Sequence, residues 1–99
     1  MNLEIGMYVR TINGKIWVIT SQKTISGHRK DIINASYNII DLIEKGDIIK
    51  GIGDMIFSVI DVDYKNKIIS GIDFWCEEKD IKSIVTKECF ESMKYKVKE

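Results

Sequence analysis

Apolar and β-branched residues gather in short runs that polar or glycine-bearing turns separate, and this pattern is typical of β-strands. Two of these runs, 8–12 and 15–20, lie on either side of Asn13-Gly14. Asn-Gly is the strongest short signal for a hairpin, because a type I′ turn needs a positive φ at both central residues. The pattern therefore predicts a tight β-hairpin over residues 8–20.

The hairpin pattern returns forty residues further along the chain, so that segment 4–20 aligns with segment 44–60 without a gap. In each copy a charged residue and a glycine precede the first strand, a glycine-bearing turn follows, and an aromatic residue lies in the next strand. A glycine at this place permits the bend that starts the first strand of SH3-like small barrels. The identical pairs are Glu4 with Glu44, Gly6 with Gly46, Ile12 with Ile52 and Ile16 with Ile56.

The rest of the chain extends the β pattern and adds short helical segments. Strands are expected at 55–62, 68–74 and 81–85 from their runs of apolar residues. Ser36 can cap a helical turn through 38–43, and Thr86 can cap a helix at the end of the chain. A full capping box would need Glu or Gln at position 89, where this chain has Cys89.

These elements predict a single mostly β domain over residues 1–99. The expected fold is an SH3-like small barrel built from two hairpin lobes, with a short C-terminal α-helix. Its expected parts are a first hairpin lobe at 4–21, an exposed loop and connection at 22–34, a second β lobe at 35–85 and the helix at 86–95.

The composition agrees with β-structure and limits the kind of partner. Isoleucine occurs twenty times and leucine twice, and β-branched residues favour strands. Fifteen basic residues balance fifteen acidic ones. A nucleic-acid-binding protein usually carries a basic excess, and a DNA-mimicking inhibitor would need an acidic one. Nucleic acid is therefore not the expected partner.

The cysteine and histidine content argues against a metal or another cofactor. Cys76 and Cys89 form no CxxC pair, and with one histidine the chain has too few soft ligands for a structural zinc site. The two cysteines are expected to be free thiols in a reducing cytoplasm. No apolar run approaches the roughly 20 residues that span a bilayer, and the opening residues do not form a signal peptide. We expect a soluble intracellular protein.

Catalysis is not expected from these residues. Nucleophilic catalysis needs a nucleophile, a base and an orienting group. His28 is the only histidine, and the neighbouring cations at 29–30 weaken it as a base. Asp61, Asp63 and Asp73 leave a paired-carboxylate hydrolase open, although alternating acids on strands more often form a solvated outer face.

The candidate ligand-binding residues are cationic or aromatic, because an anion site needs donors and a base needs a stacking platform. Plainer interpretations place Trp17 half in the core, 27–30 in a solvated loop and Trp75 at an interface. A concave pocket ringed by Arg10, Trp17 and 27–30 would favour a nucleotide, whereas a flat or convex aromatic patch would favour a protein partner. The candidates are Tyr8, Arg10, Lys15, Trp17, His28, Arg29, Lys30, Tyr37 and Trp75.

Two segments carry a resemblance to a known group of proteins. ASYNIIDLIEKGDIIKG at 35–51 and KDIKSIVTKECFESMKYKV at 79–97, with the IGMYVRT-type opening, resemble small proteins of Firmicutes phages, prophages and other mobile elements. The resemblance covers about two thirds of the chain, and the tail is its most specific part. Members of this group often have Gln where this chain has Cys89, which would complete the capping box.

The resemblance implies a biological setting. Similar ends and differing middle sections in this group imply a shared scaffold with a variable binding surface, and small accessory phage proteins often disarm host defences. We therefore expect a non-catalytic anti-defence protein in the cytoplasm of the host bacterial cell. It would sequester a nucleotide-derived immune signal as a homo-oligomer. The alternatives are an inhibitor that binds a host defence protein directly, such as a CRISPR-Cas effector, and a structural or regulatory module unrelated to defence.

Overall fold

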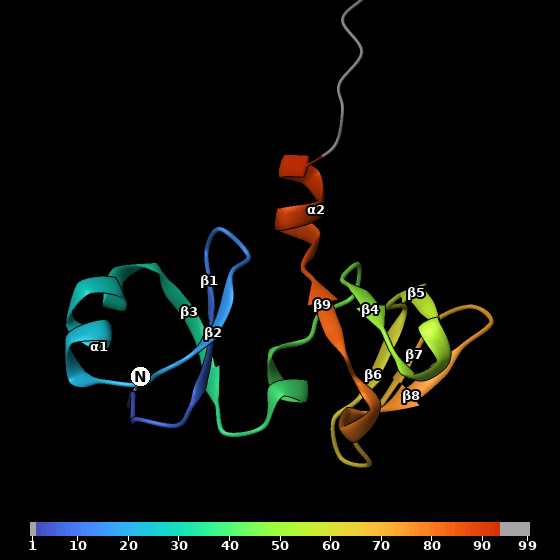
Figure 1. Ribbon diagram of the computed structural model, residues 1–99, viewed down its shortest axis with the longest axis horizontal. Coiled ribbons are helices and arrows are strands. Elements are labelled where there is room, and N and C mark those ends of the chain that lie inside the picture. The colour runs from blue at the N-terminus through green and yellow to red at the C-terminus, as the bar shows by residue number, and fades with distance from the viewer. Residues whose placement is uncertain (1, 94–99) are drawn as a thin grey trace, which may run out of the picture.

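The computed structural model describes residues 2–93, which form two lobes and a C-terminal helix (Figure 1). Lobe 1 comprises residues 2–36, and lobe 2 comprises residues 44–85. The strands are β1 (Tyr8–Thr11), β2 (Ile16–Val18), β3 (Ile32–Ser36), β4 (Ile48–Lys50), β5 (Ile56–Ser58), β6 (Asp61–Asp63), β7 (Ile68–Ser70), β8 (Trp75–Glu77) and β9 (Ser83–Val85). The helices are α1 (Gln22–His28) and α2 (Lys87–Met93), with short 3-10 turns η1 (Arg29–Asp31), η2 (Ile39–Leu42), η3 (Ile52–Asp54) and η4 (Glu78–Asp80).

The strands of residues 2–93 form three antiparallel sheets of three strands each. Sheet A, in the order β2-β1-β3, makes up lobe 1, while sheet B (β5-β4-β9) and sheet C (β6-β7-β8) make up lobe 2. The mostly β architecture with a short helix is therefore confirmed. The sheets are open and do not close into the barrel suggested by the sequence. A closed barrel needs strand pairing that continues around its circumference, and these strands of three to five residues form three separate sheets.

The hairpins that open the two lobes, β1-β2 and β4-β5, share their strand pairing, displaced by forty residues. Their turns differ, because Gly14 alone has a positive φ in the first, whereas both Gly53 and Asp54 have one in the second. Gly6 and Gly46 precede the two hairpins with φ of +96° and +95°, a left-handed conformation that glycine adopts without steric cost. The repeat recognised in the sequence is therefore present in the backbone. The corresponding bonds are Gly6 N–H to Ile19 O and Gly46 N–H to Val59 O, both 2.9 Å, and Thr11 N–H to Lys15 O at 2.9 Å and Gly51 N–H to Met55 O at 2.8 Å.

The turn between β1 and β2 is not the expected type I′ turn. Gly14 has a φ of +82°, but Asn13 does not have a positive φ. The Gly14 N–H donates to Thr11 O at 2.9 Å, and the Thr11 N–H donates to Lys15 O, which closes a three-residue loop ending in a left-handed glycine. The hairpin is confirmed, and only the glycine of Asn-Gly needs the left-handed conformation.

Segment 22–34 is not the exposed loop that the sequence suggested, because it folds into α1, η1 and most of β3. Ser21 caps α1 by accepting the Thr24 N–H at 3.4 Å, and Ile25 is buried in the core of lobe 1. A single apolar residue in a polar run leaves no helical period to detect in the sequence. Strand β3 pairs with β1, so lobe 1 also takes residues 35–36, which the sequence assigned to the second lobe.

Each lobe has its own hydrophobic core, built from inward-facing strand residues and from residues of the helices and connections next to them. The predicted helical turn at 38–43 is present as η2, which buries Ile40 and Leu42. The core of lobe 1 consists of Leu3, Val9, Ile19, Ile25 and Ile32. The core of lobe 2 consists of Ile49, Phe57, Val59, Ile69 and Cys76, with Ile40 and Ile43 from the connection between the lobes.

Helix α2 joins the two lobes at its first turn. Thr86 caps it as predicted, because its Oγ1 accepts the Cys89 N–H at 3.3 Å. The same hydroxyl donates to Gly14 O at 2.5 Å, so the tip of the β1-β2 hairpin packs against the start of α2. A side chain at Gly14 would overlap this hydroxyl. The predicted helix extended to residue 95, and positions 94–95 lie outside the described residues.

Candidate functional site

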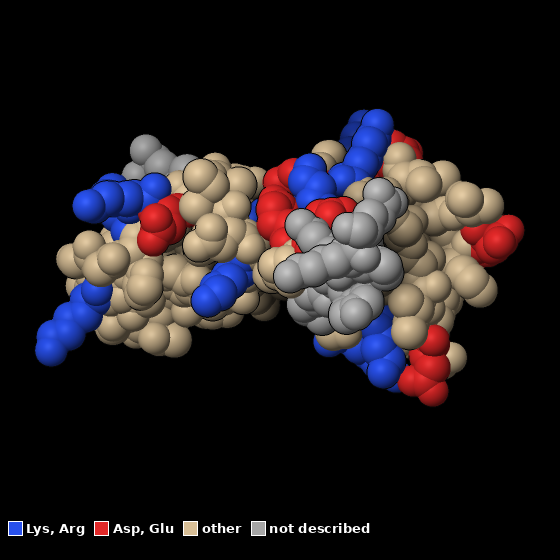
Figure 2. All heavy atoms as spheres, turned by 90° about the horizontal axis from the view of Figure 1, so that it is seen from above, with Lys and Arg blue, Asp and Glu red and all other residues tan. Residues whose placement is uncertain are grey.

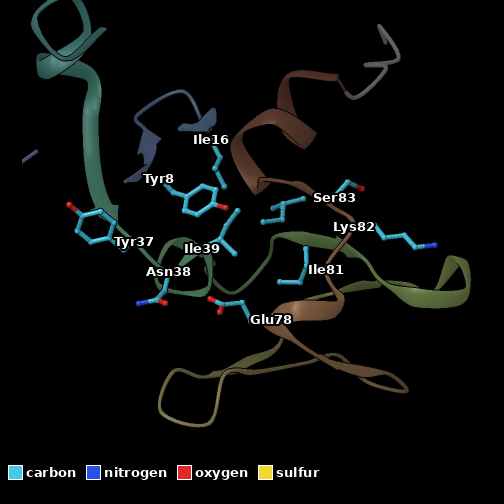
Figure 3. A pocket seen from close by; sticks show the side chains of 10 residues that line it. Tyr8, Ile16, Tyr37, Asn38, Ile39, Glu78, Ile81, Lys82 and Ser83 are labelled. Carbon is cyan, nitrogen blue, oxygen red and sulfur yellow. The ribbon is translucent and has the colours of Figure 1, made fainter. Parts of the chain in front are cut away.

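A cleft of about 480 Å³ lies between the two lobes (Figure 3). Lobe 1 contributes residues from β1 and β2, the connection between the lobes contributes 37–39, and lobe 2 contributes 81–84 with the start of β9. Because its walls come from both lobes, the cleft depends on how the lobes are held together. The lining residues are Tyr8, Ile16, Tyr37, Asn38, Ile39, Glu78, Ile81, Lys82, Ser83 and Ile84.

The walls of the cleft combine apolar and polar side chains. Ile16 lies on the lobe 1 side, and Ile81 and Ile84 lie on the lobe 2 side. The ring of Tyr8 points into the space between them (Figure 3). Tyr8 reaches the cleft because successive strand residues point to opposite faces, and Val9 next to it is buried in the core of lobe 1.

A second aromatic ring, that of Tyr37, lies at the rim of the cleft (Figure 3). Its hydroxyl donates a hydrogen bond to the carboxylate of Glu4. This hydrogen bond raises the pKa of Tyr37, so the hydroxyl stays protonated at neutral pH. The bond also ties the ring to lobe 1. Together the two tyrosines present aromatic surface against which a planar group can pack.

The charged groups of the cleft are few and largely offset one another. Glu78 is already partnered, because its Oε2 accepts the Ile40 N–H at 2.9 Å and its Oε1 lies 3.8 Å from Lys67 Nζ. Lys82 is the one cation among the lining residues, and its side chain points away from the other labelled side chains (Figure 3). A lining with one lysine and one carboxylate suits a ligand of low negative charge better than an oligophosphate.

Arg10, two residues along β1 from Tyr8, connects lobe 1 to lobe 2 and α2. Its Nη1 donates to Asp47 Oδ2 at 2.5 Å and to Leu42 O at 2.9 Å. Its Nη2 donates to Asp47 Oδ1 at 2.9 Å and to Glu88 Oε2 at 2.8 Å. Its Nε lies 3.3 Å from Glu44 Oε2 but makes no aligned hydrogen bond, so that contact is one of charge alone. We call Arg10, Glu44, Asp47 and Glu88 the Arg10 cluster.

The Arg10 cluster is structural and leaves Arg10 unavailable to a ligand. Burial by itself lowers the pKa of Arg10, but the hydrogen bond and charge of Asp47, with Glu44 and Glu88, outweigh it and raise the pKa above its usual value. Asp47 is equally buried and also accepts the backbone N–H groups of Glu44 and Lys87, at 2.8 and 2.9 Å. The expectation that Arg10 contacts a ligand therefore does not fit this structure, because its side chain is fully buried among protein partners.

The other cationic candidates do not ring the cleft. Lys15 and Trp17 line a smaller groove of about 380 Å³ between the first hairpin and the start of α2. The Trp17 ring meets the His28 ring edge-on, with centroids 5.6 Å apart. Arg29 and Lys30 are exposed on η1. Basic side chains project from the lobe 1 end of the molecule (Figure 2), so the predicted cationic ring is not assembled.

Of the predicted site residues, the structure therefore brings Tyr8 and Tyr37 to the cleft and places Trp75 on sheet C of lobe 2. Sequence reasoning missed the lobe 2 wall at 81–84. A strand was predicted there, but its pairing with β4 joins residues more than thirty positions apart, and no local pattern reports such a pairing.

Asp63 and Cys76 are two groups of a kind that often carries catalysis, and the structure gives both a structural place. Within residues 2–93, no three His, Cys, Asp or Glu side chains are arranged to hold a metal ion. Asp63 accepts the Asn66 N–H at 3.0 Å and so stabilises the turn after β6. Cys76 is buried, and burial raises the pKa of its thiol, which opposes thiolate chemistry.

Comparisons with known proteins gave no match to a family model, to a curated protein or to a solved structure. In the part of the chain from 2 to 93, no helix has both the length and the apolar character needed to cross a bilayer. The function is therefore argued from the cleft and from the surfaces of the two lobes.

Proposed function

We propose that this chain is a non-catalytic binding protein that sequesters a small planar ligand of nucleotide type in the cleft between its lobes. The cleft itself carries the proposal. Its volume of about 480 Å³ lies within the range of roughly 300–1,000 Å³ typical of small-molecule sites. Tyr8 and Tyr37 offer rings for packing, and Asn38 and Ser83 offer polar groups that can orient a ligand.

The charged side chains of the cleft favour a ligand with at most one phosphate. Lys82 can pair with one phosphate, and Glu78 can accept a hydrogen bond from an amino group of a base. Arg10 adds nothing, because the carboxylates of its own cluster surround it. A nucleoside, a monophosphate or a cyclic mononucleotide therefore fits better than a ligand with two or more phosphates.

The resemblance to mobile-element proteins supplies the biological setting of the proposal. In that setting the ligand is a nucleotide-derived immune signal in the cytoplasm of the host bacterial cell, and the protein acts by removing it from solution. Sequestration requires one binding site per signal molecule and no catalytic group. Assembly into a homo-oligomer remains a prediction, and sedimentation velocity over a range of protein concentrations tests it.

Isothermal titration calorimetry with nucleosides, monophosphates, cyclic mononucleotides, cyclic dinucleotides and ADP-ribose tests the proposal. We expect at least one ligand of low charge to bind the wild type and to be recovered intact. Ser83→Trp should abolish binding by filling the cleft, whereas Ser58→Trp, at an exposed strand serine outside the cleft, should not. Binding that survives Ser83→Trp, or no binding across the panel, would contradict the proposal. A chemically altered ligand would indicate an enzyme.

Thermal unfolding gives an independent measure of the same binding. A ligand at one hundred times its Kd adds about 2.7 kcal/mol to the free energy of unfolding. For a domain of this size each kcal/mol moves Tm by roughly 4–8 °C, so a true ligand should raise Tm by more than about 10 °C. Ser83→Trp should lose this shift while Ser58→Trp keeps it.

Direct binding to a host defence protein is a second candidate function. The observation that favours it is a group of exposed apolar side chains at the end of lobe 2 away from lobe 1, among them Ile72, Phe74 and Trp75. Exposed aromatic residues are frequent anchors of protein interfaces. The two functions use different surfaces and can be tested separately.

A further inference from the structure

Sheet C has one buried face and one outer face. Val62, Ile69 and Cys76 are paired across its three strands, and all three contact the core of lobe 2. Because side chains alternate along a strand, the residues on either side of this row point outward. The outer face therefore carries Asp61, Ser70 and Trp75 in one row and Asp63, Ile68 and Glu77 in the next.

The pairing register places these six residues side by side on the outer face. The central strand β7 contributes Ile68 and Ser70. Asp61 and Asp63 on β6 lie on one side of them, and Trp75 and Glu77 on β8 lie on the other. Neighbouring strands lie about 4.8 Å apart, so the backbones of β6 and β8 are separated by roughly 10 Å, a distance that one extended side chain lying over β7 can bridge.

The β7-β8 hairpin continues this face as an apolar tip. Ile72 is 86% exposed, Phe74 47% and Trp75 60%. The tip is held in place, because the Gly71 N–H donates to Phe74 O at 2.7 Å and Gly71 packs closely on Phe57 of the core. It lies at the end of the molecule opposite lobe 1 (Figure 1). Rigid, exposed apolar clusters of this kind mark interaction surfaces.

The same surface carries an excess of negative charge, although the whole chain has a formal net charge of zero. Asp61 and Asp63 lie on β6 and Asp73 lies in the tip, whereas Glu77 Oε2 lies 3.2 Å from Lys79 Nζ. Among residues 2–93, no ion pair involves Asp61 or Asp73. Hydrogen bonds from the backbone and side chain of Asn66 lower the pKa of Asp63, so it stays ionised. A partner that covers this surface must therefore bring positive charge.

From this combination we infer that the outer face of sheet C docks a basic segment of a partner protein, one that carries Arg or Lys beside an apolar side chain. The aliphatic stem of an arginine can lie on Ile68, while its guanidinium packs on the indole of Trp75 and pairs with the carboxylates of Asp61 and Asp63. The apolar residue of the segment covers Ile72 and Phe74. The inference does not depend on whether the cleft holds a ligand, because no residue of β6, β7 or β8 lines the cleft. The nearest lining residue in the sequence is Glu78, which follows β8.

Fluorescence anisotropy with labelled peptides tests the inference. The probes are an Arg/Leu peptide and peptides of the same length in which Glu or Gln replaces each Arg. We expect the Arg/Leu peptide to bind at least about tenfold more tightly than the other two, with an affinity that falls as salt concentration rises. Trp75→Ala should weaken its binding about tenfold or more, because the indole supplies both apolar area and a face for the guanidinium.

Matched variants separate this surface from the rest of lobe 2. Ile72→Ala and Asp61→Asn should each weaken binding, whereas Ile52→Ala and Asp54→Asn, at exposed positions on η3, should leave it unchanged. All of these side chains are exposed, so the variants should keep the wild-type Tm. Ser83→Trp, which fills the cleft, should bind the peptide normally, so failure here and failure of the cleft proposal are distinguishable.

Four outcomes would overturn the inference. They are equal affinity for the Arg, Gln and Glu peptides, full binding by Trp75→Ala, self-association of the wild type that Trp75→Ala abolishes, and binding to anionic phosphatidylserine vesicles that Trp75→Ala abolishes. The third would make the surface a contact between two copies of this chain. The fourth would make it a lipid contact.

Discussion

The two hairpins that open the lobes share their strand pairing, but equivalent side chains in them differ in burial and in contacts. Arg10 on β1 and Lys50 on β4 occupy the same place in the repeat. Arg10 is fully buried among the carboxylates of its cluster. Lys50 is exposed, and its Nζ lies 3.9 Å from Asp54 Oδ1. The repeat determines where a side chain leaves the backbone, and the neighbouring lobe determines what it contacts.

The turn before each hairpin shows the same difference. In lobe 1 the Glu4 N–H donates to the sulfur of Met7 at 3.3 Å, and in lobe 2 the Glu44 N–H donates to the carboxylate of Asp47 at 2.8 Å. The local geometry is shared, but only the carboxylate can also bind an arginine from the other lobe. Arg10 and Asp47 therefore form a contact between the lobes. Their equivalents in the repeat, Lys50 and Met7, do not form a matching one.

Replacing each of the two equivalent cations by methionine should give the largest difference in the free energy of unfolding. Arg10→Met leaves the buried carboxylate of Asp47 unpaired, and we expect the free energy of unfolding to fall by about 3–5 kcal/mol. Lys50→Met removes an exposed charge and should change it by less than about 0.5 kcal/mol. Urea denaturation followed by circular dichroism measures both. Similar losses in the two variants would show that Arg10 does not hold the lobes together.

The glycines of the two hairpin loops should differ by a smaller amount. Gly14→Ala combines a left-handed φ of +82° with overlap at Thr86 and Glu88, so we expect a loss of about 2–4 kcal/mol. Gly53 has a φ of +68° but open space around it, so Gly53→Ala should lose only about 1–2 kcal/mol. The same denaturation experiment ranks them. An equal loss would mean that α2 does not pack on the first hairpin.

The helix caps provide a finer comparison. Thr86→Val removes the acceptor for the Cys89 N–H and the donor to Gly14 O, and should lower the free energy of unfolding by about 1–2 kcal/mol. Ser21→Ala removes the longer cap bond of 3.4 Å on α1 and a hydroxyl contact with Thr24 in the same turn, and should cost about 0.5–1 kcal/mol. Differential scanning calorimetry resolves the two. A larger loss in Ser21→Ala than in Thr86→Val would mean that the stability of the fold depends more on the cap of α1 than on that of α2.

The smallest effect on stability is expected at the turn after β6. This strand belongs to sheet C, which has no counterpart in lobe 1. Hydrogen bonds from Asn66 lower the pKa of Asp63 below its ordinary 3.8, so the stability they contribute is present above that value and is lost as pH falls through the lower folded pKa. Asp63→Asn should therefore lower Tm slightly near neutral pH and not in strong acid. Asp61→Asn is the control on the same strand. A difference between Asp63→Asn and wild type that persists in strong acid would exclude this origin.

Much of the fold was predictable from local patterns. Asn13-Gly14 indicates the first hairpin because the chain reverses there over a few residues, and the forty-residue repeat indicates the second because both lobes need the same bend at Gly6 and Gly46. Helix α1 was missed because its sequence carries one buried apolar residue, Ile25, and its stability comes from packing against lobe 1.

The candidate site was predictable only in part. Tyr8 and Tyr37 were identified as aromatic residues that could stack on a base, and both line the cleft. Arg10 was assigned to a ligand because a sequence shows its charge and not its partners. Those partners, Asp47 and Glu88, lie 37 and 78 residues away, and only the packing of the two lobes brings them to the guanidinium.

Native-state hydrogen exchange at Val9 and Ile49, the equivalent central residues of β1 and β4, most directly tests whether the Arg10 cluster makes the two lobes one cooperative unit. In the wild type, both amides should exchange with the same free energy of opening, equal to that of global unfolding. In Arg10→Met, the opening free energy at Val9 should fall below that at Ile49, because lobe 1 can then open while lobe 2 stays folded. A lower value at Val9 already in the wild type, or equal values in the variant, would contradict the account.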